Sequence, residues 1–354
     1  MANVLDLRRR IRSVKSTRQI TKAMKMVAAA KLRRAQEHAL AARPYAKMIA
    51  SVLESLTRRI EIYDPESGEL RHPLFKVREE KRVLMVVVSG DKGFAGAFNA
   101  NIIKAAHQFI DCGPDQQFDV ETVGRKANDL LRRRFPAAAY SEATAEQRAV
   151  RQERKGRIEL TGNHPGMLLK LETDRVEELA KEIVSRYVHE EIDAAYIVYN
   201  EFKSVISQRV VIEKLLPIIK IGAPQVTGAI EPTTEERERA AEAALTSGVA
   251  LDEADTREAD EESRKFGTAN VDYIYEQPAD ELFNDLLPQY IASQLYHAMA
   301  ESVAAENAAR MTAMDSATNN ASEMIDSYTL QMNRVRQAAI TKEIIEIVSG
   351  AAAV

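Results

Sequence analysis

The scarcity of helix-breaking residues at both ends of this 354-residue chain constrains its fold more than any other feature of the sequence. No Gly occurs before Gly68, Pro44 is the only Pro among residues 1–60, and neither residue type occurs between Pro288 and Gly350. Since Gly and Pro are the residues least compatible with a helix interior, we predict a long helix at each end. At 1.5 Å per residue, an N-terminal helix of about 57 residues is roughly 85 Å long, which exceeds the width of a small domain.

Apolar residues in the first helix recur at alternating steps of three and four, the spacing of a coiled-coil seam. The predicted seam consists of Val4, Leu7, Ile11, Val14, Ile20, Met24, Val27, Leu32 and Ala35. Both helices adjoin the same middle region, one by its C-terminal end and the other by its N-terminal end, so a pair must be antiparallel. The second helix is the longer one, and its last turns are therefore expected to extend beyond the first. We call the helix pair the shaft.

The middle of the chain alternates between strand and helix patterns. Val83 to Val88 is a continuous apolar run of strand length, as a buried parallel strand requires. The segments that follow predict helices over 99–110, 125–134 and 174–188, strands over 118–123 and 195–199, and an edge strand over 203–216. The predicted fold class is therefore α/β: a long antiparallel coiled coil of the N- and C-terminal helices, with a small Rossmann-like domain that has a parallel sheet.

This pattern divides the chain into four parts: the N-terminal shaft helix (1–62), the α/β domain (63–221), an acidic insertion (222–270), and the C-terminal shaft helix with the segment preceding it (271–354). The insertion is polar and has no apolar stripe in its sequence. Thr233 and Glu236 have the spacing of a capping box, which predicts a helix over 234–245.

Charge is distributed unevenly along the chain, although the net charge is only −4. Residues 1–60 carry 15 Lys and Arg against three acidic residues, whereas residues 231–265 carry 12 Asp and Glu against five Lys and Arg. The basic N-terminal helix leaves three alternatives open: a solvated face, an acidic protein partner, or nucleic acid. Aromatic residues for base stacking are few, at 6% with no Trp.

Cysteine and histidine usage argues against disulfides and metal sites. Cys112 is the single cysteine, so a Cys-based zinc site is excluded and a reducing compartment is expected. The six histidines are scattered, without the i, i+4 spacing of a helical metal site. No apolar run is long enough to span a membrane, and no secretion signal is visible, so we expect a cytoplasmic protein.

The loop from Gly90 to Gly96 follows a predicted buried strand and could cradle a phosphate at a helix N-terminus. Its spacing matches neither the dinucleotide-binding pattern nor the P-loop pattern, and no acidic residue follows the second strand at Val123 to hold a ribose. No G-x-S-x-G nucleophile elbow occurs either. These observations favour a tight strand-to-helix turn and nominate no catalytic residue and no cofactor.

Three sequence blocks resemble the γ subunit of F-type ATP synthases. They are the N-terminal runs Ile11–Val14 and Ile20–Lys31, the turn Ser89–Gly96, and the C-terminal run Arg336–Ala352. Their order and separation make the resemblance specific, and it covers nearly the whole chain apart from residues 222–270. It implies a non-catalytic rotor shaft at the cytoplasmic face of the bacterial inner membrane. The partners it implies are the α and β subunits, which hold the nucleotides, the ε subunit and the c-subunit ring.

The resemblance also implies site residues at matching positions. Met24 and Lys25 match the position that faces an acidic loop of a β subunit, and Arg8, Arg9 and Arg12 extend this basic face. Further partner positions on the α/β ring side are Lys92 in the turn, Arg336, Gln337 and Thr341, and the apolar run from Ile344 to Val348, which would turn in an apolar sleeve. The resemblance places the foot of the shaft, the part that touches the c ring and the ε subunit, at Tyr273, Tyr275 and Glu276.

The sequence departs from the family pattern in two places. Phe94 and Ala95 replace the Leu and Cys that are common in the turn, and the insertion lacks a Cys, which excludes a thiol switch there. From its position and its charge we hypothesise that the insertion restrains rotation in the hydrolysis direction. The alternatives from other classes are a basic coiled-coil nucleic-acid-binding protein and a nucleotide-binding enzyme that uses the Gly-rich turn.

Overall fold

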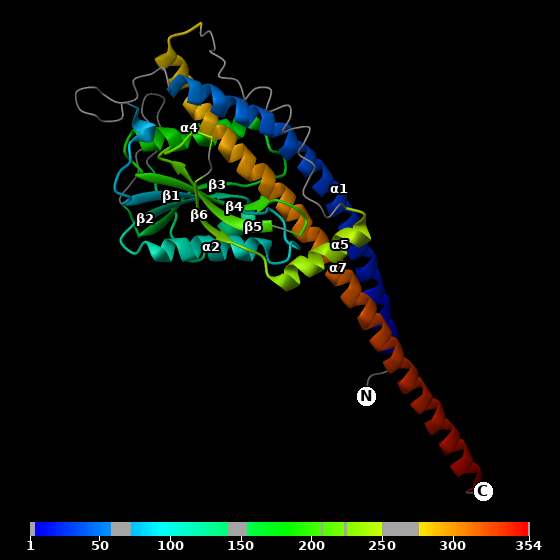
Figure 1. Cartoon of the computed structure of the whole chain (residues 1–354). Helices are drawn as coiled ribbons and strands as arrows, with labels where there is room; N and C mark the ends of the chain where they lie inside the picture. Colours follow the sequence, from blue (N-terminus) through cyan, green and yellow to red (C-terminus); the bar gives the residue numbers. More distant parts are fainter. Residues whose placement is uncertain are drawn as a thin grey trace.

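Two long helices dominate the computed structural model, which describes residues 4–57, 72–140, 154–206, 208–222, 225–249 and 276–352. Helix α1 (Val4–Thr57) and helix α7 (Ala279–Ala352) have 54 and 74 residues and continue through Pro44 and Pro288. They lie antiparallel, cross one side of the α/β domain and project from it; α7 ends at the far tip and α1 begins part-way along the projecting section (Figure 1). The predicted antiparallel shaft is confirmed. Within the described part of the chain, no helix is long and apolar enough to cross a membrane.

The seam between α1 and α7 differs from the prediction by one residue over part of its length. Ile20 and Val27, predicted as seam residues, are 58% and 56% exposed, whereas Thr21, Lys25 and Ala28 are buried. Leu7, Leu32 and Ala35 are buried as expected. The steps of three and four continue along the helix, but they run through polar side chains in the middle of the seam. Counting only apolar residues therefore placed the seam on the neighbouring stripe.

Two polar contacts hold these seam positions and fix the register of the two helices. The Lys25 ammonium lies 2.6 Å from an Asp315 carboxylate oxygen. One turn away, the hydroxyl oxygens of Thr21 and Thr318 are 2.8 Å apart. Because buried polar groups are costly when they lose their partners, these pairs disfavour any slip of α1 along α7.

The α/β domain is built on one six-stranded sheet in the order β3-β2-β1-β4-β5-β6. The strands are β1 (Arg82–Val88), β2 (Gln117–Val123), β3 (Ile158–His164), β4 (Ala194–Phe202), β5 (Gln208–Leu216) and β6 (Gln225–Ile230). Strands β1 to β4 pair in parallel, and β5 and β6 are antiparallel additions. The predicted Rossmann-like sheet is confirmed.

Two strands correct the sequence-based expectations. The sequence analysis does not predict strand β3, because its sequence is mostly polar. It predicts an edge strand over 203–216, and this is wrong in both its start and its position in the sheet. Strand β5 begins at Gln208 and is flanked by β6, which pairs with it from Val210 to Lys214. Residues 225–230 therefore belong to the sheet. On this side the edge strand is β6, near the start of the predicted insertion, and not β5 as expected.

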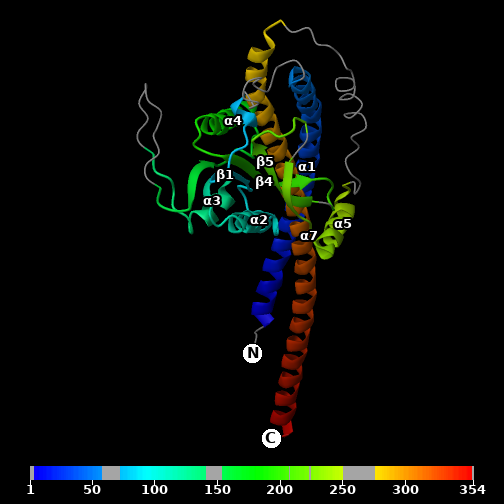
Figure 2. The same ribbon diagram turned by 60° about the vertical axis from the view of Figure 1, so that its left-hand side comes forward.

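Helices cover both faces of the sheet and produce two apolar clusters. Helices α2 (Phe98–Cys112) and α3 (Arg125–Leu131) lie on one face, and α4 (Thr173–Val188) lies on the other, as Figure 2 also shows. Alternate residues of β1 enter the two clusters, and α7 contributes to both: Ala304 to Met311 on the α2 side and Phe283 to Met299 on the α4 side. The shaft is thus part of the domain core and is rigidly joined to it.

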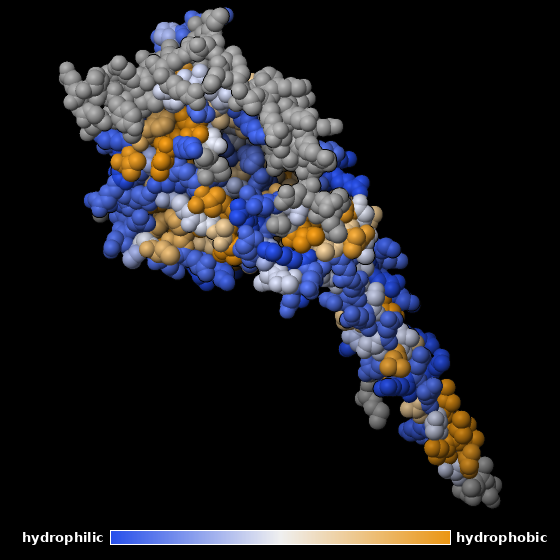
Figure 3. Space-filling model, in the orientation of Figure 1, coloured by the Kyte–Doolittle hydropathy of each residue, from blue (hydrophilic) through white to orange (hydrophobic). Residues whose placement is uncertain are grey.

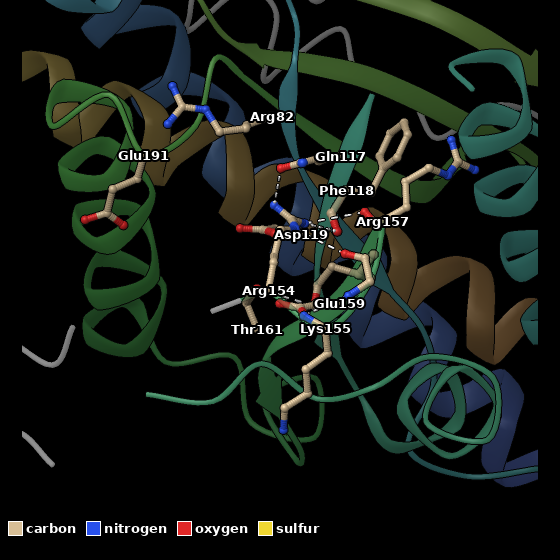
Figure 4. A network of polar contacts seen from close by, with 12 residues as sticks. Arg82, Gln117, Phe118, Asp119, Arg154, Lys155, Arg157, Glu159, Thr161 and Glu191 are labelled. Atoms are coloured by element: carbon tan, nitrogen blue, oxygen red, sulfur yellow. Dashed lines mark hydrogen bonds and ion pairs between the residues drawn. The ribbon is translucent and has the colours of Figure 1, made fainter. Parts of the chain in front are cut away.

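Strand β2 carries charged side chains inside the domain. Asp119 and Glu121 are buried, and Arg186 of α4 donates to both carboxylates, at 3.1 Å for Glu121. Arg154 lies before β3 and donates to Asp119 at 2.6 Å and to the Phe118 carbonyl oxygen at 2.9 Å (Figure 4). Two arginines from separate segments thus neutralise this strand, as buried charges require.

The face of the sheet that meets the base of the shaft holds a buried carboxylic acid. Glu213 of β5 is buried and accepts a hydrogen bond from the Tyr199 hydroxyl at 3.1 Å. It borders a cavity of about 400 Å³ that is also lined by Tyr290 and His297 of α7. Burial raises the pKa of Glu213; the Tyr199 hydrogen bond opposes this shift, and the nearby Glu201 charge adds to it.

We predict that Glu213→Gln stabilises the chain at neutral and higher pH. Because the pKa of Glu213 is raised on folding, the folded state binds its proton more tightly, and stability is lost as the pH rises above the unfolded pKa. An amide avoids this loss. The melting temperature of the variant should therefore exceed that of the native chain at about pH 8, and the difference should shrink toward about pH 4.

Glu201→Gln is the matched control, because Glu201 forms an ion pair with Arg209 on the neighbouring strand. Removing that carboxylate breaks this ion pair, and Glu201 is the smallest contributor to the raised pKa of Glu213, so the control should not stabilise the chain at either pH. An equal gain for Glu213→Gln at both pH values would contradict the assigned cause.

Candidate functional site

The end of α7 extends beyond α1 and forms a single projecting helix. The pairs Lys25–Asp315 and Thr21–Thr318 set the offset between the helices, which places the start of α1 beside residues near 335 of α7. Every side chain described from 336 to 349 is exposed. The expectation that the last turns extend beyond the first helix is confirmed. We call residues 336–352 the tip.

The tip exposes a concentration of aliphatic side chains. Exposed apolar residues of the tip are Ile340, Ile344, Ile345, Ile347 and Val348. Figure 3 shows an apolar zone near the end of the projecting helix, beyond a section whose visible face is mostly polar. A contiguous exposed apolar surface of this kind marks an interaction site, so the tip requires a partner to cover it.

Polar residues occupy the base of the tip. Arg336, Gln337 and Thr341 are all exposed, and the Thr341 hydroxyl donates to the Gln337 carbonyl oxygen of its own helix at 3.0 Å. The Arg336 guanidinium and the Gln337 amide are accordingly available to a partner. Their contact with a partner remains a prediction.

The basic face near the N-terminus is exposed as well. Arg8, Arg9 and Arg12 all point away from the seam. Arg9 has only a long contact of 4.0 Å with the exposed Asp6, and a pair of this kind contributes little. The face therefore retains its positive charge and suits an acidic partner.

Met24 and Lys25 differ in their surroundings. Met24 is half-buried, but Lys25 is only 8% exposed and binds Asp315 at 2.6 Å and the Thr246 hydroxyl at 2.9 Å. The structure therefore corrects the expected outward position of Lys25: its charge is already paired inside the chain. The one-residue shift of the seam explains the difference, because it turns Lys25 inward.

Helix α5 (Thr234–Ser247) packs on the shaft, as Figures 1 and 2 show. Its Thr246 hydroxyl accepts the hydrogen bond from Lys25. Its capping box between Thr233 and Glu236 forms as predicted, and the helix ends at Gly248 with a left-handed backbone. Three alanines are buried against the shaft, and Arg33 of α1 donates to the Gly248 carbonyl oxygen. The insertion thus does have an apolar stripe, at Ala240, Ala243 and Ala244, which was overlooked because alanine is small.

The Gly-rich turn packs directly against α7 of the shaft. A Cβ atom at Gly90 would lie 2.5 Å from the Glu306 carboxylate of α7, so a larger residue there would force the Glu306 side chain to move. Arg310 pairs with Glu306 and approaches the Gly93 carbonyl oxygen at 3.5 Å. This arrangement favours the predicted tight turn over a phosphate cradle at Gly90.

Two exposed residues of the turn face outward. Lys92 is exposed, and Phe94 is 73% exposed with a φ of +63°, a conformation that is unfavourable for a non-glycine residue. An exposed aromatic ring held in this way is suited to contact with a partner. The role of Lys92 remains a prediction.

The expected foot falls mostly outside the described residues. Tyr273 and Tyr275 lie there, whereas Glu276 is exposed just before α7. Among the residues that the structure does describe, no group of three or more His, Cys, Asp and Glu side chains could hold a metal ion.

The comparisons with known proteins give one consistent result. A family model described as ATP synthase matches residues 3–354. The ATP synthase gamma chain of Solibacter usitatus is 42% identical over 353 residues, which cover 100% of this chain and 99% of that protein. The ATP synthase gamma chain of Geobacter metallireducens is 41% identical over 353 residues, which cover 99% of this chain and 98% of the relative.

Two solved structures share the fold at low sequence identity. One is a chain from the central stalk and c ring of the mitochondrial ATP synthase of Tetrahymena thermophila. It has a TM-score of 0.50 and 21% identity, with 84% of this chain and 99% of that chain covered. The other is from the mitochondrial ATP synthase of Euglena gracilis, with a TM-score of 0.52, 16% identity, and coverage of 99% and 94%.

We predict that Lys25→Ala lowers the free energy of unfolding by about 3–5 kcal/mol, because it leaves the Asp315 carboxylate buried without its counter-charge. The double variant Lys25→Met/Asp315→Leu removes both charges and should recover most of this loss. Urea unfolding followed by circular dichroism measures both effects. Lys22→Ala, at an exposed neighbouring position, is the control; an equal effect at Lys22 and Lys25 would contradict the role assigned to the buried pair.

Proposed function

The chain belongs to the ATP synthase gamma chain family, and on that premise we propose how its structure performs the part of a rotor shaft. The chain is a non-catalytic subunit. The paired helices form the shaft, the α/β domain anchors its base, and the tip enters the catalytic head. The observation that carries this proposal is the single helix beyond residue 335, which presents an apolar surface with no counterpart on α1.

The tip fits a bearing formed by the α and β subunits. Aliphatic side chains such as Ile344 and Val348 would turn inside an apolar sleeve, where no directional bond opposes rotation. Arg336, Gln337 and Thr341 lie just below and would make polar contacts with β subunits. Such contacts can form and break as the shaft turns, since each single exposed hydrogen bond contributes only about 1 kcal/mol net.

The sides of the shaft present different exposed side chains to the surrounding β subunits. Arg8, Arg9 and Arg12 present positive charge on one face, and Lys92 and Phe94 project from the turn farther along. Three identical subunits around such an asymmetric shaft meet different surfaces and so populate different conformations. Rotation then cycles each β subunit through binding, synthesis and release of ATP, with the catalytic sites on β.

The base of the shaft would receive the rotation. Tyr273, Tyr275 and Glu276 precede α7 and would contact the c-subunit ring and the ε subunit. The two solved structures that share this fold are of ATP synthase assemblies that include a c ring. We infer that the chain works at the cytoplasmic face of the bacterial inner membrane and would contact the membrane only through the c ring.

Family membership favours this function over a basic coiled coil that binds nucleic acid. The buried position of Lys25 points the same way, because this residue of the basic helix is committed to a contact within the chain.

We predict that the double variant Arg8→Glu/Arg9→Glu weakens coupling in the assembled enzyme. Reversed charges would repel the acidic loops of the head, and two exposed interactions of about 0.5–1 kcal/mol each correspond to roughly a five- to thirtyfold fall in proton-driven ATP synthesis. Lys104→Glu on exposed α2 changes the charge without touching the shaft and is the control. Unchanged synthesis in an intact complex would exclude an acidic partner at this face.

We further propose that the acidic segment restrains rotation in the hydrolysis direction. Its described part docks α5 on the shaft beside Lys25, and residues 231–265 carry a net charge of −7, from five basic and 12 acidic residues. Such a segment can bind a neighbouring basic surface in one rotary position and hold the shaft there.

Deleting residues 231–266 tests this proposal. ATP hydrolysis by the assembled complex should rise, while ATP synthesis stays near the native rate. The control is Glu238→Ala, an exposed single change on α5 that leaves its docked face intact. Unchanged hydrolysis after the deletion would rule out a restraining role.

A further inference from the structure

The cavity of about 400 Å³ beside Glu213 lies where the shaft meets the sheet. Residues of α1 and α7 line it from the shaft, residues of β4 and β5 line it from the sheet, and Gly222 completes the lining. Its volume falls within the range of about 300–1,000 Å³ that is usual for small-molecule sites. A ligand in this cavity would contact the shaft and the domain at the same time.

Three carboxylates line this cavity: Glu201 of β4, Glu213 of β5 and Glu301 of α7. All three act on the Tyr199 hydroxyl: burial raises the pKa of Tyr199, and the negative charges of these three acids raise it further. Lys47 of α1 brings one positive charge to the lining. Carboxylates therefore predominate there, and the cavity attracts positive charge.

The three acids differ in the partners that they have. Glu201 forms an ion pair with Arg209 of β5, and a carboxylate oxygen of Glu301 lies 3.4 Å from the His297 imidazole. Among the residues that the structure describes, none forms an ion pair with Glu213, whose carboxylate accepts from a neutral hydroxyl. Glu213 is therefore the acid that an external cation would neutralise.

One carboxylate oxygen of Glu213 faces the cavity without a hydrogen-bond donor. Glu213 is only 6% exposed, and its Oε2 accepts from the Tyr199 hydroxyl at 3.1 Å. Within the described part of the chain, its Oε1 accepts no hydrogen bond, yet this atom is not closed to solvent, in contrast to Oε2 of Glu121. Oε1 therefore opens on the cavity that Glu213 lines. Since a buried acceptor without a donor is costly, a ligand that donates to Oε1 is favoured.

Buried acids elsewhere in the same sheet are neutralised by arginine. Asp119 and Glu121 of β2 both bind Arg186, and Asp119 also binds Arg154. A carboxylate with the burial of Glu213 must either bind a proton or pair with a cation. The geometry at Glu213 leaves room for the second solution, because its open oxygen borders a cavity large enough for a small molecule.

We propose that this cavity binds the ammonium group of a small aliphatic amine, with Oε1 of Glu213 as the acceptor. An ammonium group supplies both a positive charge and hydrogen-bond donors. Ala46 and Ala50 of α1 give its alkyl chain an apolar wall, and Glu301 lines the same cavity and suits a second ammonium group. In the described residues no group of three His, Cys, Asp and Glu side chains could hold a metal ion, which favours an organic cation. The proposal does not depend on the rotary function, since binding is a property of the chain alone.

Calorimetric titration of the full-length chain with putrescine, butylamine and butanol, at about pH 8 and constant ionic strength, tests the proposal. Both amines should bind, and butanol, which has the same chain length but no charge, should not. Glu213→Gln should weaken the binding of both amines about tenfold or more, because a hydrogen bond between two charged groups is lost. Glu80→Gln is the matched control: this carboxylate pairs with Lys214, the neighbour of Glu213 on β5, and does not line the cavity. It should leave the affinities unchanged.

The pH dependence of binding is a second readout. Because the pKa of Glu213 is raised by burial, a rising pH removes its proton while the amine, with a pKa of about 10, stays charged. The affinity for butylamine should therefore rise between about pH 5 and pH 8, by up to about tenfold per pH unit below the pKa of Glu213. This rise should be smaller in Glu213→Gln. The other titratable groups at the cavity are the same in both chains: Lys47 of α1, Tyr199 and Glu201 of β4, and Tyr290, His297 and Glu301 of α7.

Each outcome of these titrations bears on the site. Tighter binding of putrescine than of butylamine identifies a diamine, and an affinity for butylamine that is equal or higher identifies one ammonium group as sufficient; both outcomes support the site. Four results would overturn it: equal binding of butanol and butylamine, equal weakening by Glu80→Gln and Glu213→Gln, the same pH dependence in the native chain and Glu213→Gln, or no binding of either amine at millimolar concentration.

Discussion

The pairing of α1 with α7 in one fixed register is the constraint on which the other features of the structure depend. Most of the stability of a helix in a protein comes from packing against other elements and not from its own backbone bonds, so the seam must supply both stability and alignment. Aliphatic and alanine contacts supply the stability. The polar pairs Thr21–Thr318 and Lys25–Asp315 supply the alignment, because a slip of even one turn would leave the buried Asp315 carboxylate without a partner. Where the tip begins follows directly from that alignment.

The α/β domain uses the shaft as part of its own interior. Residues of α7 enter the apolar clusters on both faces of the sheet, and Glu306 occupies the space that Gly90 leaves open. The Gly-rich turn, whose glycines suggest a phosphate-binding loop, instead packs against α7 and connects the sheet to the shaft.

Much of this architecture could be predicted from the sequence, and the failures have physical causes. Helix-breaker counts and the apolar run of β1 identified the shaft and the centre of the sheet, since both depend on local composition. The seam near Ile20 was misplaced because a buried ammonium at Lys25 is acceptable only with a partner 290 residues away in the sequence. Strands β3 and β6 were not foreseen, since edge strands are half exposed and carry mixed residues. The alanine stripe of α5 was overlooked for lack of bulk.

The offset between the two helices has a mechanical consequence. Along most of the shaft a twisting load is carried by two helices that are locked together by the polar layers, but beyond residue 335 it is carried by one helix. A single helix is more compliant in torsion and bending than a coupled pair. The tip can therefore bend to follow the surface that encloses it. The paired section below resists twisting and so passes the rotation of the base on to the tip with little loss.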